Sequence, residues 1–212
     1  MSPRLLPRRA TGTKQKKGAG GSLLELVTIV AVALGLALGI QAFLVKPFRI
    51  PSESMVPTLE IGQRVLVNRV SGHFSDYDRG DILVFKPPEG AETNSCGVQH
   101  AETSSCPTPT KQRSDTNFIK RVVAVGGDRV RVVGGRVILN GTRQKESFAA
   151  LSSDCELCNL PDEITIPKGY YFMMGDNRGA SADSREWGPI PKKWVIGRAF
   201  ATYWPPKRIG IL

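Results

Sequence analysis

A run of twenty residues from Leu26 to Val45 contains no charged side chain, and it constrains the fold more than any other feature of the chain. As a helix with a rise of ~1.5 Å per residue, this run extends about 30 Å, the thickness of the hydrocarbon core of a bilayer. A helix that is apolar on every face is typical of a membrane span or a deeply buried core. The sequence therefore predicts a transmembrane helix over residues 23–45.

Two other interpretations fit the apolar run less well. A cleaved secretory signal has a shorter apolar region and small residues at its exit, whereas Phe43, Leu44 and Val45 precede Lys46 here. A core helix of a small protein is rarely apolar all round. We therefore expect the segment to be retained. Its Gly35-x-x-x-Gly39 spacing fits a weak helix dimerisation face, so self-association of the span is a further expectation.

The distribution of charge predicts the orientation of the span. The net charge is +10. Beyond the cations that precede the span, the positive charge is spread along the chain without a basic stripe, so nucleic-acid binding is not expected. Positive flanks usually stay in the cytoplasm. We expect residues 1–22 to form a basic cytoplasmic tail beside the lipid bilayer and residues 46–212 to lie outside the cell membrane. Six cations precede the span: Arg4, Arg8, Arg9, Lys14, Lys16 and Lys17.

The region after residue 46 has the pattern of a mostly β domain. Short β-branched runs are bounded by Gly, Asp or Pro, and Gly134-Gly135 supplies a two-residue hairpin turn. Two stretches lack periodicity: residues 87–117 predict a surface insert, and residues 142–160 predict an irregular excursion. We expect an antiparallel, barrel-like sheet from the remaining runs: 64–68, 81–85, 118–125, 130–133, 136–139, 164–166, 170–174 and 194–200.

The four cysteines all follow the predicted span, in the compartment where disulfides persist. Three pairings are available, and short loops favour Cys96–Cys106 and Cys155–Cys158. A zinc site is the alternative, but the spacings and the lack of a suitably spaced histidine argue against it. The Cys155–Cys158 spacing also occurs in redox motifs, which sit in a strand–helix context that this sequence does not predict.

Ser54 is the candidate nucleophile, because its stretch, residues 50–59, begins five residues after the apolar run and so places the serine at a membrane surface. A serine hydroxyl is a poor nucleophile until a base removes its proton. Histidine is the usual base. The chain has two histidines, His73 in a Gly/Ser-rich turn and His100 in the predicted insert, and both positions are typical of solvated surface.

Lys120 is the other candidate base, sixty-six residues beyond Ser54 in a β-branched run. A lysine acts as a base only when neutral, so its pKa must fall from ~10.4. Burial among apolar groups lowers a lysine pKa by up to ~3–5 units. Strand alternation points Lys120 and Arg121 to opposite faces, so one can be buried while the other is solvated. An ordinary exposed lysine is the alternative that composition alone favours.

Five motifs together resemble the bacterial type I signal peptidases. They occur in the family's order: Pro51-Ser52-Glu53-Ser54-Met55-Val56-Pro57-Thr58-Leu59, Arg79-Gly80-Asp81-Ile82-Leu83-Val84-Phe85, Ile119-Lys120-Arg121, Gly126-Gly127-Asp128, and Gly175-Asp176-Asn177-Arg178 with Ser181 to Arg185. The resemblance implies a serine endopeptidase with a serine–lysine dyad. Ser54 is then the nucleophile and Lys120 the general base.

The same resemblance implies supporting roles for other residues. Ser52 is similar to the family's side-chain contributor to the oxyanion hole, and Ser181 would orient the lysine amine. Two departures from the pattern are present: Gly179-Ala180 replaces the Asp-Asn of many relatives, and the insert before Ile119 is longer. Asp183 and Arg185 would brace the site as an ion pair, and Phe48, Ile50 and Ile119 match positions that line substrate pockets.

The implied substrates are exported preproteins with signal peptides, which carry small residues before the cut. An extended peptide would add as a strand to a sheet edge near Lys120. No metal and no cofactor are expected. One alternative is a serine–lysine protease dedicated to a single secreted substrate; another is a non-enzymatic, membrane-tethered β scaffold. Self-cleaving repressors of the SOS response share the dyad chemistry but carry a DNA-binding helix-turn-helix, which this sequence lacks.

Overall fold

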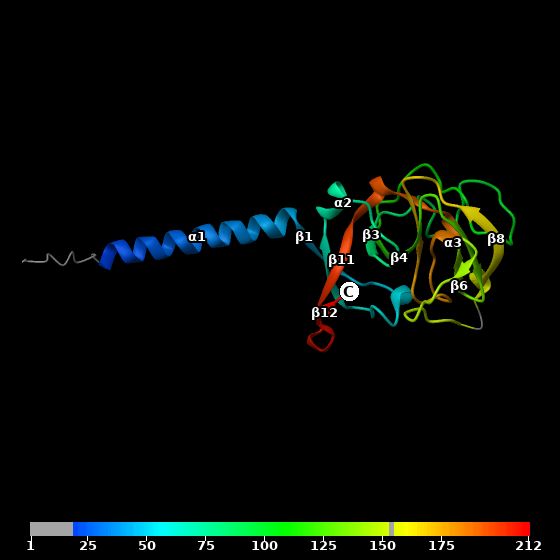
Figure 1. The fold of residues 1–212 in the computed structure, drawn as a ribbon. Coiled ribbons are helices and arrows are strands. Elements are labelled where there is room, and N and C mark those ends of the chain that lie inside the picture. The colour runs from blue at the N-terminus through cyan, green and yellow to red at the C-terminus, as the bar shows by residue number, and fades with distance from the viewer. Residues whose placement is uncertain (1–18, 153–154) are drawn as a thin grey trace, which may run out of the picture. The chain divides into compact units, whose positions relative to one another are not determined.

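The computed structural model describes residues 19–152 and 155–212, and the chain divides into two units, Met1–Ile40 and Gln41–Leu212. The helix α1 (Ala19–Phe43) is 25 residues long and is drawn in blue in Figure 1. Across the described ranges, no helix combines the length and the apolar character needed to cross a bilayer. The span expected over residues 23–45 stays a prediction, and the six cations of the expected basic tail lie outside the described residues.

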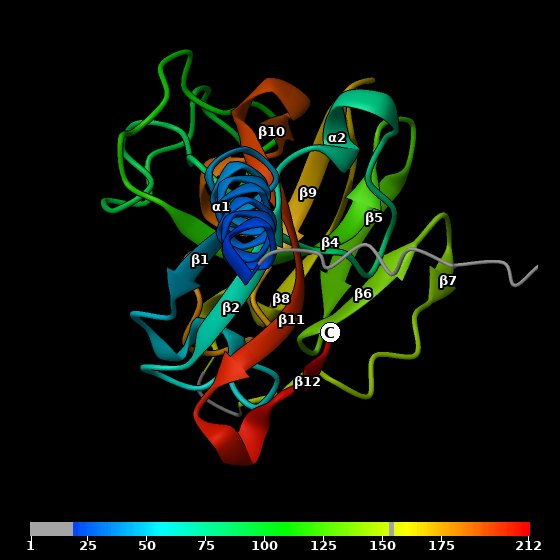
Figure 2. The ribbon, with the colours of Figure 1, turned by 90° about the vertical axis from the view of Figure 1, so that its left-hand side faces the viewer.

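The second unit consists mainly of strands in two sheets (Figures 1 and 2). All pairs between these strands are antiparallel, which confirms the predicted mostly β, antiparallel fold. In spatial order, the larger sheet contains β1 (Val45–Arg49), β2 (Arg64–Asn68), β11 (Val195–Trp204), β3 (Ile82–Phe85), β4 (Phe118–Val125), β9 (Tyr170–Met174) and β10 (Ile190–Pro191), with β12 (Gly210–Ile211) paired to β11. The smaller sheet contains β7 (Thr142–Arg143), β6 (Arg136–Leu139), β5 (Arg129–Val133) and β8 (Asn159–Thr165).

Helices in the second unit are short connections between strands. Two of them are α-helical turns and four are 3₁₀ turns within the described residues. A cluster of buried side chains from the larger sheet and the segment before β2 lies under the first 3₁₀ turn. The helical elements are α2 (Ser71–Phe74), α3 (Ser184–Trp187), η1 (Glu53–Met55), η2 (Glu156–Cys158), η3 (Lys192–Trp194) and η4 (Pro206–Arg208).

The predicted hairpin is present between β5 and β6. Its turn residues Gly134 and Gly135 have φ values of 57° and 72°, a region that favours glycine. The strand β8 begins at Asn159, within the stretch expected to be irregular, so that boundary was wrong. Polar residues dominate β8, and pairing with β5 rather than a local apolar pattern makes this segment a strand.

The two disulfides join Cys96 to Cys106 and Cys155 to Cys158, which confirms the pairings that short loops favour. Sequence spacing gave no reason to place a histidine beside these cysteines, yet His100 lies next to the first disulfide. Both sulfurs there are bonded to each other and offer no thiolate to a metal. Around this disulfide, residues 87–117 hold isolated bridges and no strand.

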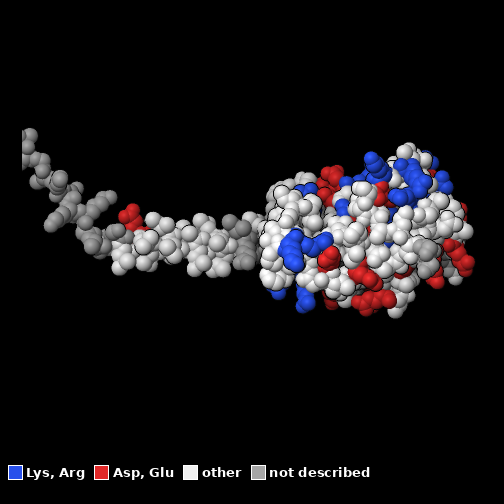
Figure 3. All heavy atoms as spheres, turned by 90° about the horizontal axis from the view of Figure 1, so that it is seen from below, with Lys and Arg blue, Asp and Glu red and all other residues white. Residues whose placement is uncertain are grey.

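Acidic and basic side chains of the second unit are interspersed on the face shown in Figure 3. Several are paired across elements, for example Arg208 with Glu60 at 2.7 Å. A mixed surface of this kind creates no extended field of one sign. That nucleic acid does not bind stays a prediction.

Candidate active site

Ser54 lies in η1, directly after the segment that leaves β1, and the residue is only 5% exposed. The hydrophobic core anchors this turn, because Met55 and Leu59 are fully buried. The Leu59 N–H also donates to the Met55 carbonyl at 2.8 Å. The Ser54 carbonyl accepts from the Asn177 N–H at 3.0 Å. The hydroxyl oxygens of Ser52 and Ser54 are 3.3 Å apart. Packing and hydrogen bonds thus fix the backbone of the candidate nucleophile.

Lys120 lies in β4, opposite Leu83 of β3, and is 4% exposed. Burial lowers the pKa of Lys120 from 10.5 to about 8, although the nearby Asp183 carboxylate opposes this shift. The Lys120 Nζ lies 5.6 Å from the centroid of the Phe118 ring. Its neighbour Arg121 is held elsewhere, since it donates to Asp176 from Nε at 2.9 Å and from Nη2 at 2.6 Å. The buried amine can therefore be neutral in mildly alkaline solution.

Ser54 and Lys120 line the same cavity, which has a volume of about 300 Å³. Of the hydrogen bonds found in the described ranges, none joins Ser54 Oγ to Lys120 Nζ. Catalytic hydrogen bonds are often long in a free enzyme and tighten when substrate binds. The residues that line this cavity are Pro51, Ser52, Ser54, Asn117, Phe118, Ile119, Lys120, Ala180 and Ala182.

A second cavity of about 280 Å³ adjoins the first and shares four of its lining residues. Phe48, Ile50 and Ile119 line it. The same three side chains also pack in the hydrophobic cluster under η1, so core packing and pocket lining coexist at these positions. The shared residues are Pro51, Asn117, Phe118 and Ile119.

Asp183 is the centre of a buried hydrogen-bond network at the start of α3. Its Oδ2 accepts from Ser181 Oγ at 2.8 Å and from the Gly175 N–H at 3.0 Å. Arg185 donates to it from Nε at 2.8 Å and from Nη2 at 2.9 Å. Burial by itself would raise the pKa of Asp183, but the Arg185 guanidinium, the Gly175 N–H and the Lys120 ammonium together hold the pKa below its usual value. Because Ser181 gives its proton to Asp183, its oxygen lone pairs remain available to a donor.

Gly175 allows the loop that carries this network to approach η1. A Cβ at this position would collide with the Ser181 hydroxyl and with the Ser54 carbonyl oxygen. Only a residue without a side chain permits this contact. The Ser181 side chain and the Ser54 carbonyl therefore both lie against Gly175, where Ser181 donates to Asp183.

Several contacts of the site carry no local sequence signal. Asp176 accepts from both Arg121 and Thr58, and the motif containing Asp176 did not indicate these partners. Arg178 is buried and pairs with Glu146 at 2.6 Å, 32 residues away along the chain. Ala180 and Ala182 of the lining were not predicted either, although their position beside Ser181 could have suggested them.

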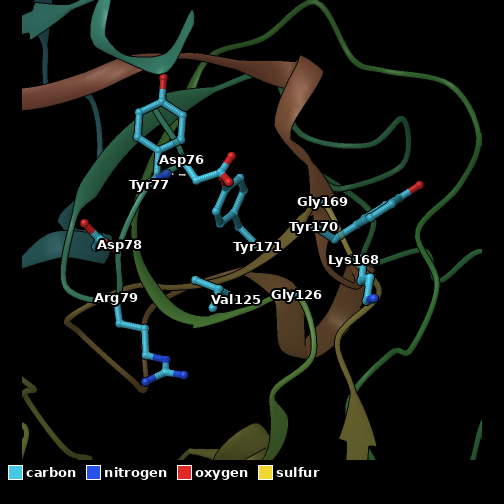
Figure 4. A pocket seen from close by; sticks show the side chains of 10 residues that line it. All are labelled: Asp76, Tyr77, Asp78, Arg79, Val125, Gly126, Lys168, Gly169, Tyr170 and Tyr171. Atoms are coloured by element: carbon cyan, nitrogen blue, oxygen red, sulfur yellow. Dashed lines mark hydrogen bonds between the residues drawn. The ribbon is translucent and has the colours of Figure 1, made fainter. Parts of the chain in front are cut away.

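A larger cavity of about 660 Å³ lies between the segment 76–79, the turn at Gly126 and the start of β9 (Figure 4). None of the predicted site residues lines it. Two of its charged groups form ion pairs: Arg79 pairs with Asp128 at 2.6 Å, and Asp76 pairs with Lys192 at 2.7 Å. The cavity that holds Ser54 and Lys120 is therefore the candidate active site, although it is smaller.

A family model described as signal peptidase, peptidase S26, matches residues 23–204. The chain is 35% identical to signal peptidase I of Leptolyngbya laminosa, covering 100% of this chain and 93% of that protein. It is 36% identical to a probable thylakoidal processing peptidase 2 of Arabidopsis thaliana, covering 93% of this chain and 50% of that protein. A solved signal peptidase I of Enterococcus faecalis V583 is 22% identical, with a TM-score of 0.40 over 58% of this chain and 97% of that one. The chain belongs to the signal peptidase family, peptidase S26.

Proposed function

We propose that this signal peptidase removes signal peptides from exported preproteins with a dyad of Ser54 and Lys120. The observation that carries the proposal is the shared cavity, which combines a serine in a fixed turn with a buried lysine. Burial lowers the pKa of that lysine to about 8, within reach of neutral to alkaline solution. A base of this kind needs no histidine, metal or cofactor.

The proposed reaction begins when Ser54 Oγ attacks the scissile carbonyl carbon and Lys120 Nζ accepts the hydroxyl proton. Negative charge then develops on the carbonyl oxygen. The Ser54 N–H and the Ser52 hydroxyl, whose oxygen lies 3.3 Å from Ser54 Oγ, would stabilise it. As the C–N bond breaks, the Lys120 ammonium gives its proton to the leaving amine. Water then hydrolyses the ester, with Lys120 again acting as the base.

Substrate binding is proposed to occur along β4. In the described sheet, residues 118–120 pair with β3 on one side and with no strand on the other, because the pairing of β4 with β9 starts at Arg121. An extended peptide can add to this free edge through backbone hydrogen bonds. The two neighbouring cavities are small and partly apolar, which favours small side chains before the cut.

A membrane anchor is proposed for the N-terminal segment, with the N-terminus in the cytoplasm and the peptidase domain outside. Support comes from the uncharged run that ends at Val45 and from the exposed leucine, isoleucine and valine side chains of α1 between Leu23 and Leu38. Such a run would partition into a lipid bilayer. Around Gly35 and Gly39 a Cβ would meet nothing within 4 Å, so both surfaces are open to a second helix.

The test uses the full chain purified in detergent, a preprotein with a signal peptide, and sequencing of the new N-terminus. We expect cleavage by the wild type and none by Ser54→Ala or Lys120→Arg, since a guanidinium cannot serve as a base. The exposed positions Ser147 and Lys111 provide matched controls, Ser147→Ala and Lys111→Arg, which should cut normally. Full turnover by folded Lys120→Arg protein would exclude the dyad.

The pH dependence gives an independent check on the base. Protonated Lys120 is inactive, so kcat/KM should rise with pH and level off above about 8, the pKa that burial gives Lys120. His73→Ala and His100→Ala should leave that limb in place. A limb near ~6.5 that disappears in either histidine variant would favour a histidine base instead.

The range of substrates separates the two enzymatic alternatives. A general signal peptidase should cleave a panel of unrelated preproteins that share only small residues before the cut. An enzyme dedicated to one secreted protein should cleave a single member of the panel. The same assay repeated with EDTA checks the expectation that no metal is required.

A further inference from the structure

The segment 146–150 lies along the loop that follows β9 and carries part of the candidate active site. The Ala150 N–H donates to the Asp176 carbonyl at 2.8 Å, and the Arg178 N–H donates to the Ala150 carbonyl at 2.9 Å. At the other end of the segment, the Glu146 carboxylate pairs with the buried Arg178 guanidinium at 2.6 Å. Both ends of the segment are therefore fixed against this loop.

Phe148, in the middle of the segment, covers the guanidinium of Arg121 in β4. The Cζ atom of Arg121 lies 4.0 Å from the centroid of the Phe148 ring. The edge of the same guanidinium is engaged, since Nε and Nη2 donate to the Asp176 carboxylate and Nη1 donates to the Gly80 carbonyl at 2.8 Å. The Arg121 side chain is only 12% exposed. An aromatic ring attracts a cation placed over its face, and more strongly where water is excluded.

Asp176 connects Arg121 to the turn of the candidate nucleophile. This residue is fully buried, and its Oδ2 accepts from Arg121 Nη2 at 2.6 Å and from Thr58 Oγ1 at 2.5 Å. The N–H of the next residue, Asn177, donates to the Ser54 carbonyl at 3.0 Å. The residue before Arg121 in β4 is the candidate base. A chain of contacts thus runs from the aromatic ring to both members of the proposed dyad.

We propose that Phe148 is a positioning residue of the candidate active site. Its ring holds Arg121 against Asp176. Through that ion pair, it fixes the turn of Ser54 relative to the strand of Lys120. The inference rests on the proposed function, in which these last two residues react. Without the ring, water reaches the guanidinium and competes with the carboxylate for its hydrogen bonds, so the loop is held less firmly.

The position of Phe148 determines which kinetic constant it affects. Phe148 lines neither of the two cavities that would take the substrate. Its removal leaves those cavities intact and misplaces the reacting groups, which lowers kcat with little effect on KM. A residue that only stabilised the fold would lower the fraction of active protein, and the loss of activity would follow the free energy of unfolding.

The first test compares Phe148 variants of the full chain in detergent by their cleavage of a preprotein. Phe148→Ala removes the ring and should lower kcat about 5–30-fold in folded protein, with KM unchanged. Phe148→Tyr keeps an aromatic face and should retain most of kcat. Phe148→Leu keeps apolar bulk without the ring and should fall between them; it also replaces Phe148→Ala if that variant does not fold. Phe74→Ala, at a position that is 86% exposed, is the matched control and should cut normally.

A double-mutant cycle tests whether the ring acts through Asp176. Thr58→Val removes one hydrogen bond to that carboxylate and should itself lower kcat. If Phe148 acts through the same carboxylate, Phe148→Ala should lower kcat by a factor at least about two-fold smaller in the Thr58→Val background than in the wild type. Strictly additive losses would mean that the two side chains act independently, and would overturn the proposal.

Hydrogen exchange in the inactive Ser54→Ala protein gives a reading that does not depend on cleavage. The amides of Asn177 and Arg178 donate to carbonyls of the nucleophile turn and of the segment 146–150, and both should exchange about 5–30-fold faster in Phe148→Ala. Phe148→Tyr should leave both rates in place. Unchanged exchange in Phe148→Ala, or equal acceleration in Phe148→Tyr, would also overturn the proposal. A failed dyad assignment is recognised separately, by cleavage in the Ser54→Ala protein.

Discussion

Besides its proposed role in the reaction, the buried Lys120 lowers the free energy of unfolding. Its pKa is about 8 in the folded chain and 10.5 in the reference state, so the unfolded chain binds the proton more tightly. Below pH 8 both states are protonated and the cost is full, about 3 kcal/mol. The cost decreases between pH 8 and 10.5 and vanishes above that range.

Replacing Lys120 with methionine should therefore stabilise the protein. We expect Lys120→Met to raise the free energy of unfolding by up to ~3 kcal/mol at neutral pH, with the gain shrinking as pH rises through the alkaline range. Denaturant unfolding at several pH values measures the effect. The exposed Lys145→Met is the control and should change little. A gain of equal size at every pH would point to better packing rather than to removal of a buried charge.

At the scale of elements, the two disulfides close loops of different length. Cys96 and Cys106 are 10 residues apart, and Cys155 and Cys158 are 3 apart. The loop-closure entropy removed from the unfolded chain gives about 3 kcal/mol for the longer loop and about 2 kcal/mol for the shorter. The longer loop also anchors residues 87–117 to α3, through the bond from the Cys106 N–H to the Arg185 carbonyl.

Serine replacements at each pair test this difference. The Cys96→Ser/Cys106→Ser variant should lose about 1 kcal/mol more stability than Cys155→Ser/Cys158→Ser, as measured by denaturant unfolding under non-reducing conditions. It should also weaken the hold of the insert on α3, seen as faster hydrogen exchange at the Cys106 position. The opposite order of stabilities would mean that native contacts, rather than loop length, determine the contribution of each bond.

The strands also differ in how well their positions can be predicted from the sequence. β2 and β4 match the predicted runs residue for residue, because valine, isoleucine and leucine dominate both. β1 and β10 were not predicted, since each contains a proline and little alternation. Such strands form because a partner strand supplies the hydrogen bonds, and that partner is distant in the sequence. Local pattern therefore indicates the centre of the sheet better than its ends.

The orientation of the whole molecule is open to a direct experiment. An N-terminally tagged chain expressed in bacteria is converted to spheroplasts and treated with added protease. The region after Lys46 should be digested, while the tag and the first 22 residues survive, because cations flanking a span stay inside. Lysed spheroplasts are the control, in which both parts should be degraded. Digestion of the tag in intact spheroplasts would reverse the topology inferred from charge.

Across the whole molecule, the sequence indicates which residues are candidates for the site, but it does not indicate the hydrogen bonds between them. Ser54, Lys120 and Asp183 stand in recognisable motifs, whereas the bonds from Ser181 to Asp183 and from Asn177 to the Ser54 carbonyl depend on the close approach at Gly175. Such contacts are set by tertiary packing. No period or spacing in the chain encodes them.

The buried pair of Arg178 and Glu146 has a consequence for anyone wishing to trim this protein to a smaller catalyst. Arg178 belongs to the loop that carries Asp183, yet its guanidinium reaches the Gly135 carbonyl at 2.7 Å and the Glu146 carboxylate at 2.6 Å. Glu146 in turn accepts from the Val137 N–H in β6. A chain cut back to the larger sheet would strand a guanidinium in the interior without its counter-ion. The smaller sheet thus supports the loop of the candidate active site, and a minimal version of this protein has to keep it.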